Sequence, residues 1–112
     1  MKLATFTHGG RTRIGRVDGD RMLDLTAAGL PADMLSFLEG GAELMQRAAA
    51  ASGASVPLAE VTLCAPVSRP PKILAVGLNY KDHIEETGLD TPKFPMFFNK
   101  QSTAAHGPYT PF

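Results

Sequence analysis

Apolar and polar residues alternate in the first quarter of the chain with the period of two that is typical of β-strands. Three short runs carry this alternation, namely Lys2–Thr7, Arg11–Val17 and Arg21–Leu25. His8–Gly10 separates the first two runs as a turn. The Asp-Gly pair in Asp18–Asp20 suits a tight hairpin turn between the second and third. The pattern therefore predicts β structure at the start of the chain.

The period changes to that of a helix between residues 26 and 53. Pro31 and Asp33 favour the first turn of a helix, and the Gly-Gly pair at 40–41 is expected to end it. A second helix is predicted over Ala42–Ser52, with Gly53 after its last turn. The residues expected to face a core recur at helical spacing. They are Met34, Phe37, Leu38, Leu44, Met45 and Ala48.

A proline-rich connector follows the helical region. Leu58–Leu63 is compatible with a short strand, and prolines then recur up to Pro71. Proline removes an amide donor and stiffens the backbone, so we expect a domain boundary here. The sequence predicts a small N-terminal α/β (α+β) domain over residues 1–67 and the beginning of a second domain over residues 68–112.

The second part of the chain has two apolar runs around a polar segment. Ile73–Val76 is short and continuously apolar, which suits a strand buried on both faces. Gly77 is expected to mark a sharp turn or a close approach of the backbone. Asn79 suits the N-cap of a helical turn over Tyr80–Thr87, and Gly88 is expected to end that turn. A loop with two prolines leads to the second strand-like run, Met96–Asn99, and the remaining residues are expected to form a loop.

Composition excludes several classes of protein. The 112 residues include 44% hydrophobic and 20% charged residues, as in globular proteins. Eleven basic residues balance eleven acidic ones without a basic block, which gives no support for nucleic-acid binding. No apolar stretch approaches the roughly 20 residues of a membrane span, so we expect no membrane association and a cytoplasmic location. The single cysteine, Cys64, lies among apolar residues and is expected to be a buried filler.

His83 and Glu86 are the candidate catalytic pair. Residues three apart lie on one side of a helical turn, so the two side chains can converge. A carboxylate that orients a histidine supports its use in moving a proton or activating water near neutral pH. The pattern H-x-x-E is weak by itself, because an exposed helical turn with several charged residues looks the same.

The residues around this pair make the pattern more specific. In sequence order they are Val76-Gly77-Leu78-Asn79-Tyr80, Asp82-His83, Glu86, Pro95, Phe97, Phe98, Lys100 and Ser102. Their order and spacing resemble the start of the catalytic domain of the fumarylacetoacetate hydrolase (FAH) family. The family's serine or threonine usually stands next to a proline, where this chain has Gln101-Ser102. The upstream part is similar to the small N-terminal domain that many members carry.

This resemblance implies a metal-dependent enzyme with a β-rich catalytic domain, a mixed β-sandwich or roll. Members use Mg²⁺ or Mn²⁺ and act on 1,3-diketo or 2-oxo acids, cleaving carbon–carbon bonds, decarboxylating, isomerising or hydrating. It implies that His83 and Glu86 activate water or move the proton on a lid-like segment. The positions implied to contact substrate are Gly77, Asn79, Tyr80, Phe98 and Lys100. The complete protein is expected to be a homodimer that binds a small keto acid.

Two features depart from the family pattern. Leu78 stands where some members have an arginine that contacts a carboxylate, which weakly disfavours short dicarboxylates such as oxaloacetate. The family's metal ligands, three carboxylates, lie further along its sequence, and no Asp or Glu occurs from Thr91 to Phe112. We therefore expect the ligands beyond Phe112, no metal on this chain alone, and a truncated N-terminal portion of such an enzyme.

Three functions stay open from the sequence. The complete protein is a hydrolase or lyase of this family, or an isomerase, hydratase or decarboxylase of the same family, or this chain is a binding module without catalysis. A further expectation concerns the isolated chain. The runs Ile73–Val76 and Met96–Phe98 need partners, so we expect the chain to associate or to be only partly ordered beyond about Pro70.

Overall fold

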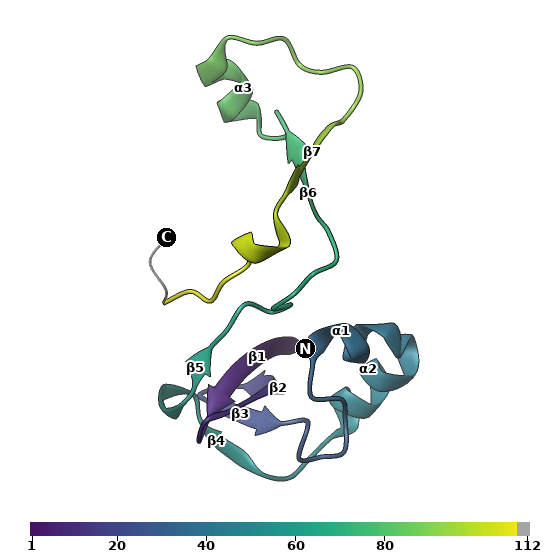
Figure 1. Cartoon of the computed structure of the whole chain (residues 1–112), viewed down its shortest axis with the longest axis vertical. Helices are drawn as coiled ribbons and strands as arrows, with labels where there is room; N and C mark the ends of the chain where they lie inside the picture. The colour runs from purple at the N-terminus through teal and green to yellow at the C-terminus, as the bar shows by residue number, and fades with distance from the viewer. Residues whose placement is uncertain (110–112) are drawn as a thin grey trace. The chain divides into compact units, whose positions relative to one another are not determined.

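A computed structural model describes residues 1–109 of the chain. The chain forms two compact units (Figure 1). The first contains Met1–Arg69 together with the described residues from Ala105 onward, and the second contains Pro70–Ala104. The division after Arg69 lies close to the boundary expected from the prolines. The assignment of residues 1–67 and 68–112 to separate domains stays a prediction.

The first unit is built on a five-stranded antiparallel sheet with the strand order β4-β3-β2-β1-β5. The strands are β1 (Lys2–His8), β2 (Arg11–Asp18), β3 (Arg21–Asp24), β4 (Ser55–Pro57) and β5 (Thr62–Leu63). Both predicted turns are present, because β1 pairs with β2 from His8↔Arg11 and β2 pairs with β3 from Asp18↔Arg21. Gly9, Gly10 and Gly19 have positive φ, the conformation that such two-residue hairpin turns require. The three predicted N-terminal strands are confirmed.

Two short helices, α1 (Met34–Glu39) and α2 (Gly41–Ala50), lie beside each other and pack on this sheet (Figure 1). The Asp33 side chain caps α1 by accepting a hydrogen bond from the Ser36 amide at 2.9 Å. The buried core joins sheet to helices. Its members are Ile14, Leu23, Leu25, Leu30, Met34, Phe37 and Ala48, with Leu3, Leu44, Ala51 and Val67 packed against them.

The helical pattern predicted the inner face only in part. Met34, Phe37 and Ala48 are buried, but Leu38 is 49% exposed and Met45 is 40% exposed, so the prediction that these two face the core is wrong. The helices are short, six and ten residues, and each turns a narrow strip towards the sheet. Side chains at the margin of that strip stay at the surface. The Gly-Gly pair ends α1 as predicted, and its second residue also begins α2.

The region between α2 and Arg69 supplies both edge strands of the sheet, β4 and β5. Leu58–Leu63, predicted as a possible strand, contains a 3₁₀ turn at Leu58–Glu60 and only the two-residue β5. Cys64 is half-buried rather than buried, with its Sγ 3.4 Å from the Thr7 hydroxyl. Near the end of the chain, Gly107 lies against the β5 edge. A Cβ added to Gly107 would be 2.7 Å from the Leu63 carbonyl oxygen.

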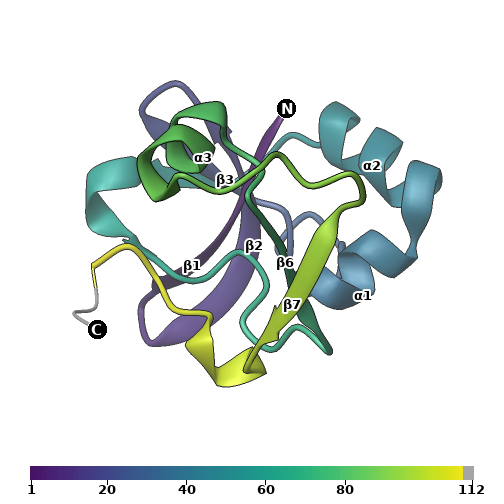
Figure 2. The ribbon, with the colours of Figure 1, turned by 90° about the horizontal axis from the view of Figure 1, so that it is seen from above.

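The second unit is a two-stranded antiparallel hairpin that carries one helix (Figure 1 and Figure 2). It contains β6 (Ile73–Gly77), α3 (Lys81–Thr87), β7 (Met96–Lys100) and a 3₁₀ turn at Ser102–Ala104. The prediction that the first run is buried on both faces is wrong for this chain, because Leu74 is 63% exposed. Gly88 ends α3 in the left-handed conformation, as predicted.

Candidate functional site

The candidate residues are placed by the pairing of β6 with β7. The register sets Gly77 opposite Met96 and Ala75 opposite Phe98, so the end of the first apolar run meets the start of the second. A Cβ added to Gly77 would lie 3.5 Å from Met96 Cε and 3.6 Å from Phe98 Cε1. The two side chains therefore lie over the glycine at ordinary contact distance. A Cβ would fit there, so the close approach expected at Gly77 is not observed.

The turn from β6 into α3 is made by Leu78. Its φ is 51°, the one positive value among the described residues other than glycine. For a residue with a side chain this left-handed conformation is unfavourable by about 1–2 kcal/mol. Sequence reasoning placed the sharp turn or close approach at Gly77 and missed the strained position beside it. No feature of the sequence indicates that a leucine adopts this conformation.

Helix α3 begins one residue later than predicted. Its N-cap is Tyr80, in an extended conformation and without a side-chain hydrogen bond to the helix. The prediction that Asn79 is the N-cap is therefore wrong. Asn79 belongs to the turn that the left-handed Leu78 creates, two residues before the first residue of the helix. Tyr80 itself is 77% exposed.

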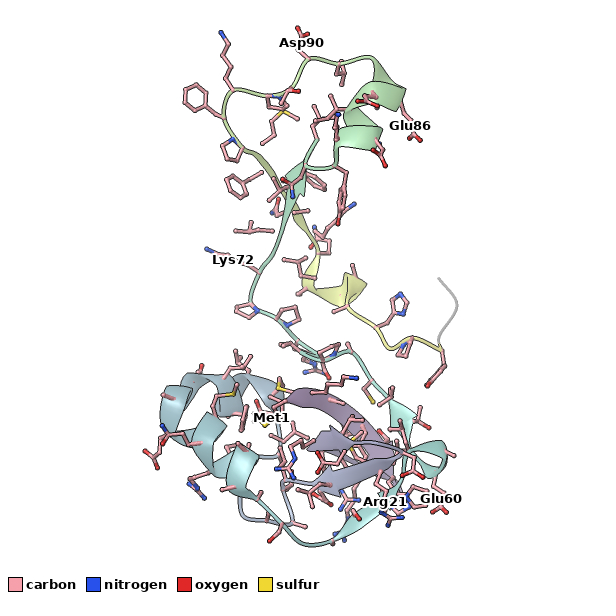
Figure 3. All side chains as sticks on the ribbon, turned by 180° about the vertical axis from the view of Figure 1, so that it is seen from behind. Met1, Arg21, Glu60, Lys72, Glu86 and Asp90 are labelled. Atoms are coloured by element: carbon pink, nitrogen blue, oxygen red, sulfur yellow. The ribbon has the colours of Figure 1, made fainter. Side chains whose placement is uncertain are left out.

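His83 and Glu86 are both exposed on α3. With 3.6 residues per turn they are about 60° apart around the helix axis, so the helix presents them on one side. Ile84, which is half-buried, marks the side of α3 that packs inward. Figure 3 shows Glu86 on the outer side of α3, away from the β6–β7 hairpin. Both side chains are thus open to a molecule that approaches this side of the helix.

Within residues 1–109, no hydrogen bond joins the side chains of His83 and Glu86. The His83 carbonyl accepts a hydrogen bond from the Thr87 hydroxyl at 3.0 Å, which helps to close the last turn. On the neighbouring face, Lys81 Nζ lies 3.7 Å from a Glu85 carboxylate oxygen. Lys81 and Glu85 thus form an ion pair that leaves the carboxylate of Glu86 outside it.

The five expected substrate contacts do not share one hollow. Gly77 and Asn79 line a hollow of about 590 Å³ between α3 and the loop before β7. Phe98 and Lys100 line a second hollow, of about 460 Å³, at the other end of the hairpin. There the Lys100 ammonium lies 5.4 Å from the centre of the Phe98 ring, a cation–π contact. Tyr80, His83 and Glu86 line neither hollow.

A divalent metal does not fit the residues that are described. Hard cations are held by several oxygen ligands, mostly carboxylates. No group of three or more His, Cys, Asp or Glu side chains in residues 1–109 is arranged to hold a metal ion. His83 and Glu86 are two possible ligands without a third.

Comparison with known proteins shows which family the chain is related to. A family profile described as Rv2993c-like, N-terminal matches residues 1–66. The chain is 45% identical over 83 residues to the mitochondrial oxaloacetate tautomerase Fahd2a of Rattus norvegicus. It is 42% identical over 83 residues to fumarylacetoacetate hydrolase domain-containing protein 2 of Pongo abelii. This chain belongs to the FAH family. Its resemblance to the N-terminal portion of that family is confirmed.

Two crystal structures are also similar to the structure of this chain. One is a protein assigned as HpcE from Mycobacterium smegmatis, with a TM-score of 0.79, 31% identity and 96% of this chain covered. The other is maleylpyruvate hydrolase from Sphingobium sp. SYK-6 in complex with manganese(II) and pyruvate, with a TM-score of 0.60, 32% identity and 93% coverage. The mixed α/β fold with an antiparallel sheet is therefore that of FAH-family N-terminal regions.

The matched proteins are longer than this chain. It spans 26% of the rat and Pongo abelii relatives, which match 71% of it, and 38% of each of the two crystallised chains. The expected β-rich catalytic domain stays a prediction for that reason. In the described part of the chain, no helix is long and apolar enough to cross a membrane. The rat relative is named as mitochondrial, so the expected cytoplasmic location also stays a prediction.

Proposed function

We propose that the protein to which this chain belongs is a metal-dependent hydrolase or lyase that cleaves carbon–carbon bonds in 1,3-diketo or 2-oxo acids. One observation carries the proposal. His83 and Glu86 lie exposed on one side of α3, directly after the turn at the end of β6. The chain that presents them is 32% identical, over 93% of its length, to a maleylpyruvate hydrolase crystallised with manganese and pyruvate.

The proposed division of roles follows from the chemistry of the two side chains. His83 accepts the proton of the attacking water through a ring nitrogen, the usual role of a histidine in general base catalysis. Glu86 orients that ring and stabilises its protonated form. Gly77 and Asn79 shape the backbone at the end of β6, and Tyr80, Phe98 and Lys100 contact the substrate. Each of these roles is part of the proposal.

The proposal includes Mg²⁺ or Mn²⁺ as the cofactor of the whole protein. The described residues do not fit such an ion by themselves, so its carboxylate ligands are proposed to lie outside residues 1–109. A homodimer with a small keto-acid substrate is proposed for the whole protein on the same family grounds.

A second activity is supported by the names of the relatives. Proteins that are 41–45% identical to the chain over 83–97 residues are named oxaloacetate tautomerases. The same histidine can remove a proton from carbon and return it to oxygen, with no water consumed. Leu78 disfavours a short dicarboxylate substrate, and these names favour one. Comparing an acylpyruvate with oxaloacetate as substrates of the whole protein separates the two activities.

The test uses the whole protein with Mn²⁺ and the variants His83→Ala and Glu86→Ala. General acid–base groups contribute about 10²- to 10⁴-fold, so kcat should fall by that order in both variants, while circular dichroism stays unchanged. Asp90→Ala is the matched control, an exposed acidic residue outside α3. It should keep the full rate. Full activity of both dyad variants would remove His83 and Glu86 from the mechanism.

A further inference from the structure

A small hollow in the first unit contains no residue of α3 or of the β6–β7 hairpin. Its volume is about 260 Å³, and its walls come from β2, β3, the start of β4 and the loop that joins α2 to β4. The lining contains two guanidinium groups, one carboxylate and two hydroxyl groups. The lining residues are Arg16, Asp18, Arg21, Leu23, Ala51, Ser52, Gly53 and Ser55.

Arg16 and the one lining carboxylate, Asp18, satisfy each other. Arg16 Nε lies 2.9 Å and 3.0 Å from the two carboxylate oxygens, and Arg16 Nη2 donates to one of them at 2.7 Å. Arg16 Nη1 donates to two carbonyls at the end of α2. The charges of Arg16 and Asp18 therefore cancel, and the carbonyls at the negative end of the helix already have a donor.

Arg21 differs from Arg16 because its charge is not balanced. Its Nε donates to Ser55 Oγ at 2.8 Å and its Nη2 to the Ser55 carbonyl at 2.7 Å. It forms no ion pair within residues 1–109, and it is exposed on the first unit (Figure 3). A guanidinium has five N–H donors, so three remain for a ligand. The two bonds to Ser55 hold these donors in a fixed orientation.

The two serine hydroxyls add further donors. Ser55 Oγ accepts a hydrogen bond from Arg21, which leaves its own hydrogen free to donate. The hydroxyl of Ser52, exposed in the loop before β4, makes no hydrogen bond within residues 1–109. Gly53 beside it has a φ of 140°, a conformation that side chains rarely permit, so the shape of this loop depends on the glycine. Together, Arg21 and the serines offer five donors to one ligand.

We propose that this hollow binds a phosphate group, either as free phosphate or as the monoester of a small molecule. The planar fork of Arg21 matches two oxygens of a phosphate, and the serine hydroxyls donate to the others. A phosphate monoester has three terminal oxygens and a charge of about −1.5 to −2 at pH 7, whereas a carboxylate has two oxygens and a single charge. Five donors around one positive charge therefore favour phosphate. This inference goes beyond the proposed function, and neither depends on the other.

The experiment is an NMR titration of the ¹⁵N-labelled 112-residue chain at constant ionic strength. The probes are inorganic phosphate, glycerol 3-phosphate and acetate. Phosphate should shift the amides of Ser52, Gly53 and Ser55 and the Nε–H signal of Arg21 in a saturable way. Acetate should bind at least about fivefold more weakly, because it has fewer acceptors and less charge. Tighter binding of glycerol 3-phosphate would assign the site to a phosphorylated small molecule, and equal binding would assign it to phosphate itself; both results support the proposal.

Two variants test the donors. Arg21→Gln should weaken phosphate binding by about fivefold, as for the loss of one strong ion pair at the surface. Arg11→Gln is the matched control, since it removes the same charge from an exposed arginine of the same unit that does not line the hollow. It should leave the affinity unchanged. Ser52→Ala should weaken binding by about twofold. This second variant lies in an exposed loop, so it tests the site even if Arg21→Gln disturbs the pairing of β3 with β4.

Three results would overturn the inference. The first is equal weakening by Arg21→Gln and Arg11→Gln, which would mean that phosphate responds only to the net charge. The second is acetate binding as tight as phosphate binding. The third is the absence of a saturable shift at the loop amides. The titration measures no turnover, so its outcome is distinct from that of the His83 and Glu86 variants.

Discussion

The guanidinium of Arg16 in β2 donates a hydrogen bond to the main-chain carbonyl of Ala48 in α2 at 2.6 Å. It donates a second one to the carbonyl of Ala49 at 2.8 Å and is held in place by the carboxylate of Asp18 at 2.7 Å. The last carbonyls of a helix have no partner within the helix and carry its negative dipole end. A strand of the sheet thus supplies the cap of α2.

Replacing Arg16 by Met should therefore lower the thermal midpoint of the chain and speed hydrogen exchange in the last turn of α2. The loss follows from the two carbonyls left without their donor. Arg16→Lys should recover only part of the midpoint, because one ammonium cannot reproduce the planar fork that reaches two carbonyls and a carboxylate. Arg11→Met, an exposed arginine at the start of the same strand, is the control and should change little. Equal midpoints for the Arg16 and Arg11 variants would contradict this role.

The stability of the folded chain should decrease in acid as the carboxylates of Asp33 and Asp18 become protonated. The Ser36 amide donates to Asp33 and lowers the pKa of that carboxyl below its usual value, and the hydrogen bond from Arg16 lowers the pKa of Asp18. A carboxyl whose pKa is lower in the folded chain stabilises it above the unfolded pKa of about 4, and this contribution is lost as pH falls through the folded value. Urea midpoints should be level above about pH 5 and decline below about pH 4.

The variant Asp33→Asn tests whether protonation of Asp33 causes part of the loss of stability in acid. Asparagine also caps helices well, so the variant should be nearly as stable as the parent at pH 7. It has no carboxyl to protonate, so its midpoint should decline less in acid. A decline as steep as that of the parent would assign the acid sensitivity to other groups.

Gly15 in β2 should not tolerate even one methyl group. A Cβ added there would clash with Met22 Sδ and would lie 2.8 Å from the Leu23 carbonyl oxygen. Overpacking of this kind costs about 1–3 kcal/mol, so Gly15→Ala should lower the free energy of unfolding by about that amount in urea titrations. The same substitution in a Met22→Ala background should cost less, because the sulfur is gone. Additive losses would mean that the Met22 contact is not the cause.

The sequence predicted most of the first unit because its information is local. A period of two and Asp-Gly or Gly-Gly turns define β1 to β3, and both follow from steric rules that act over a few residues. The predictions for Leu38 and Met45 were wrong because the sheet covers only a narrow strip of each helix. Helical spacing tells which residues share a side, but only the packed structure tells how much of that side the sheet covers.

The candidate site could also be predicted only in part from the sequence. The spacing of His83 and Glu86 on one helix was local and could be predicted, whereas the left-handed Leu78 and the resulting loss of the Asn79 cap could not. The separation of Gly77 and Asn79 from Lys100 follows from the hairpin register, which pairs Gly77 with Met96 and Lys100 with Ile73. In a strand pair, residues near opposite ends lie far apart even when they belong to one motif. A sequence motif lists such residues together without placing them together.

The isolated chain should associate through the β6–β7 hairpin. The register places Leu74, Val76 and Phe97 on one face, and Leu74 and Phe97 are 63% and 65% exposed. Burying one such side chain contributes about 1.5–3 kcal/mol. The double variant Leu74→Ser with Phe97→Ser should therefore weaken association by at least about tenfold in sedimentation velocity. Leu38→Ser, an exposed leucine on α1, should not. A monomer at high concentration in the parent chain would reject this surface.

Leu78 offers a direct test of backbone strain in the turn that leads to the candidate dyad. Leu78→Ala and Leu78→Gly both remove the side chain beyond Cβ, but only glycine, which also lacks Cβ, adopts a φ of 51° without steric conflict. The relief of about 1–2 kcal/mol is partly offset by the greater entropy of glycine in the unfolded chain, about 0.4–1 kcal/mol. The β6–β7 amides should therefore be better protected from hydrogen exchange in the glycine variant, by up to about tenfold. Equal protection would mean that the turn relaxes to another conformation once the leucine is gone, and that the side chain itself holds the backbone in place.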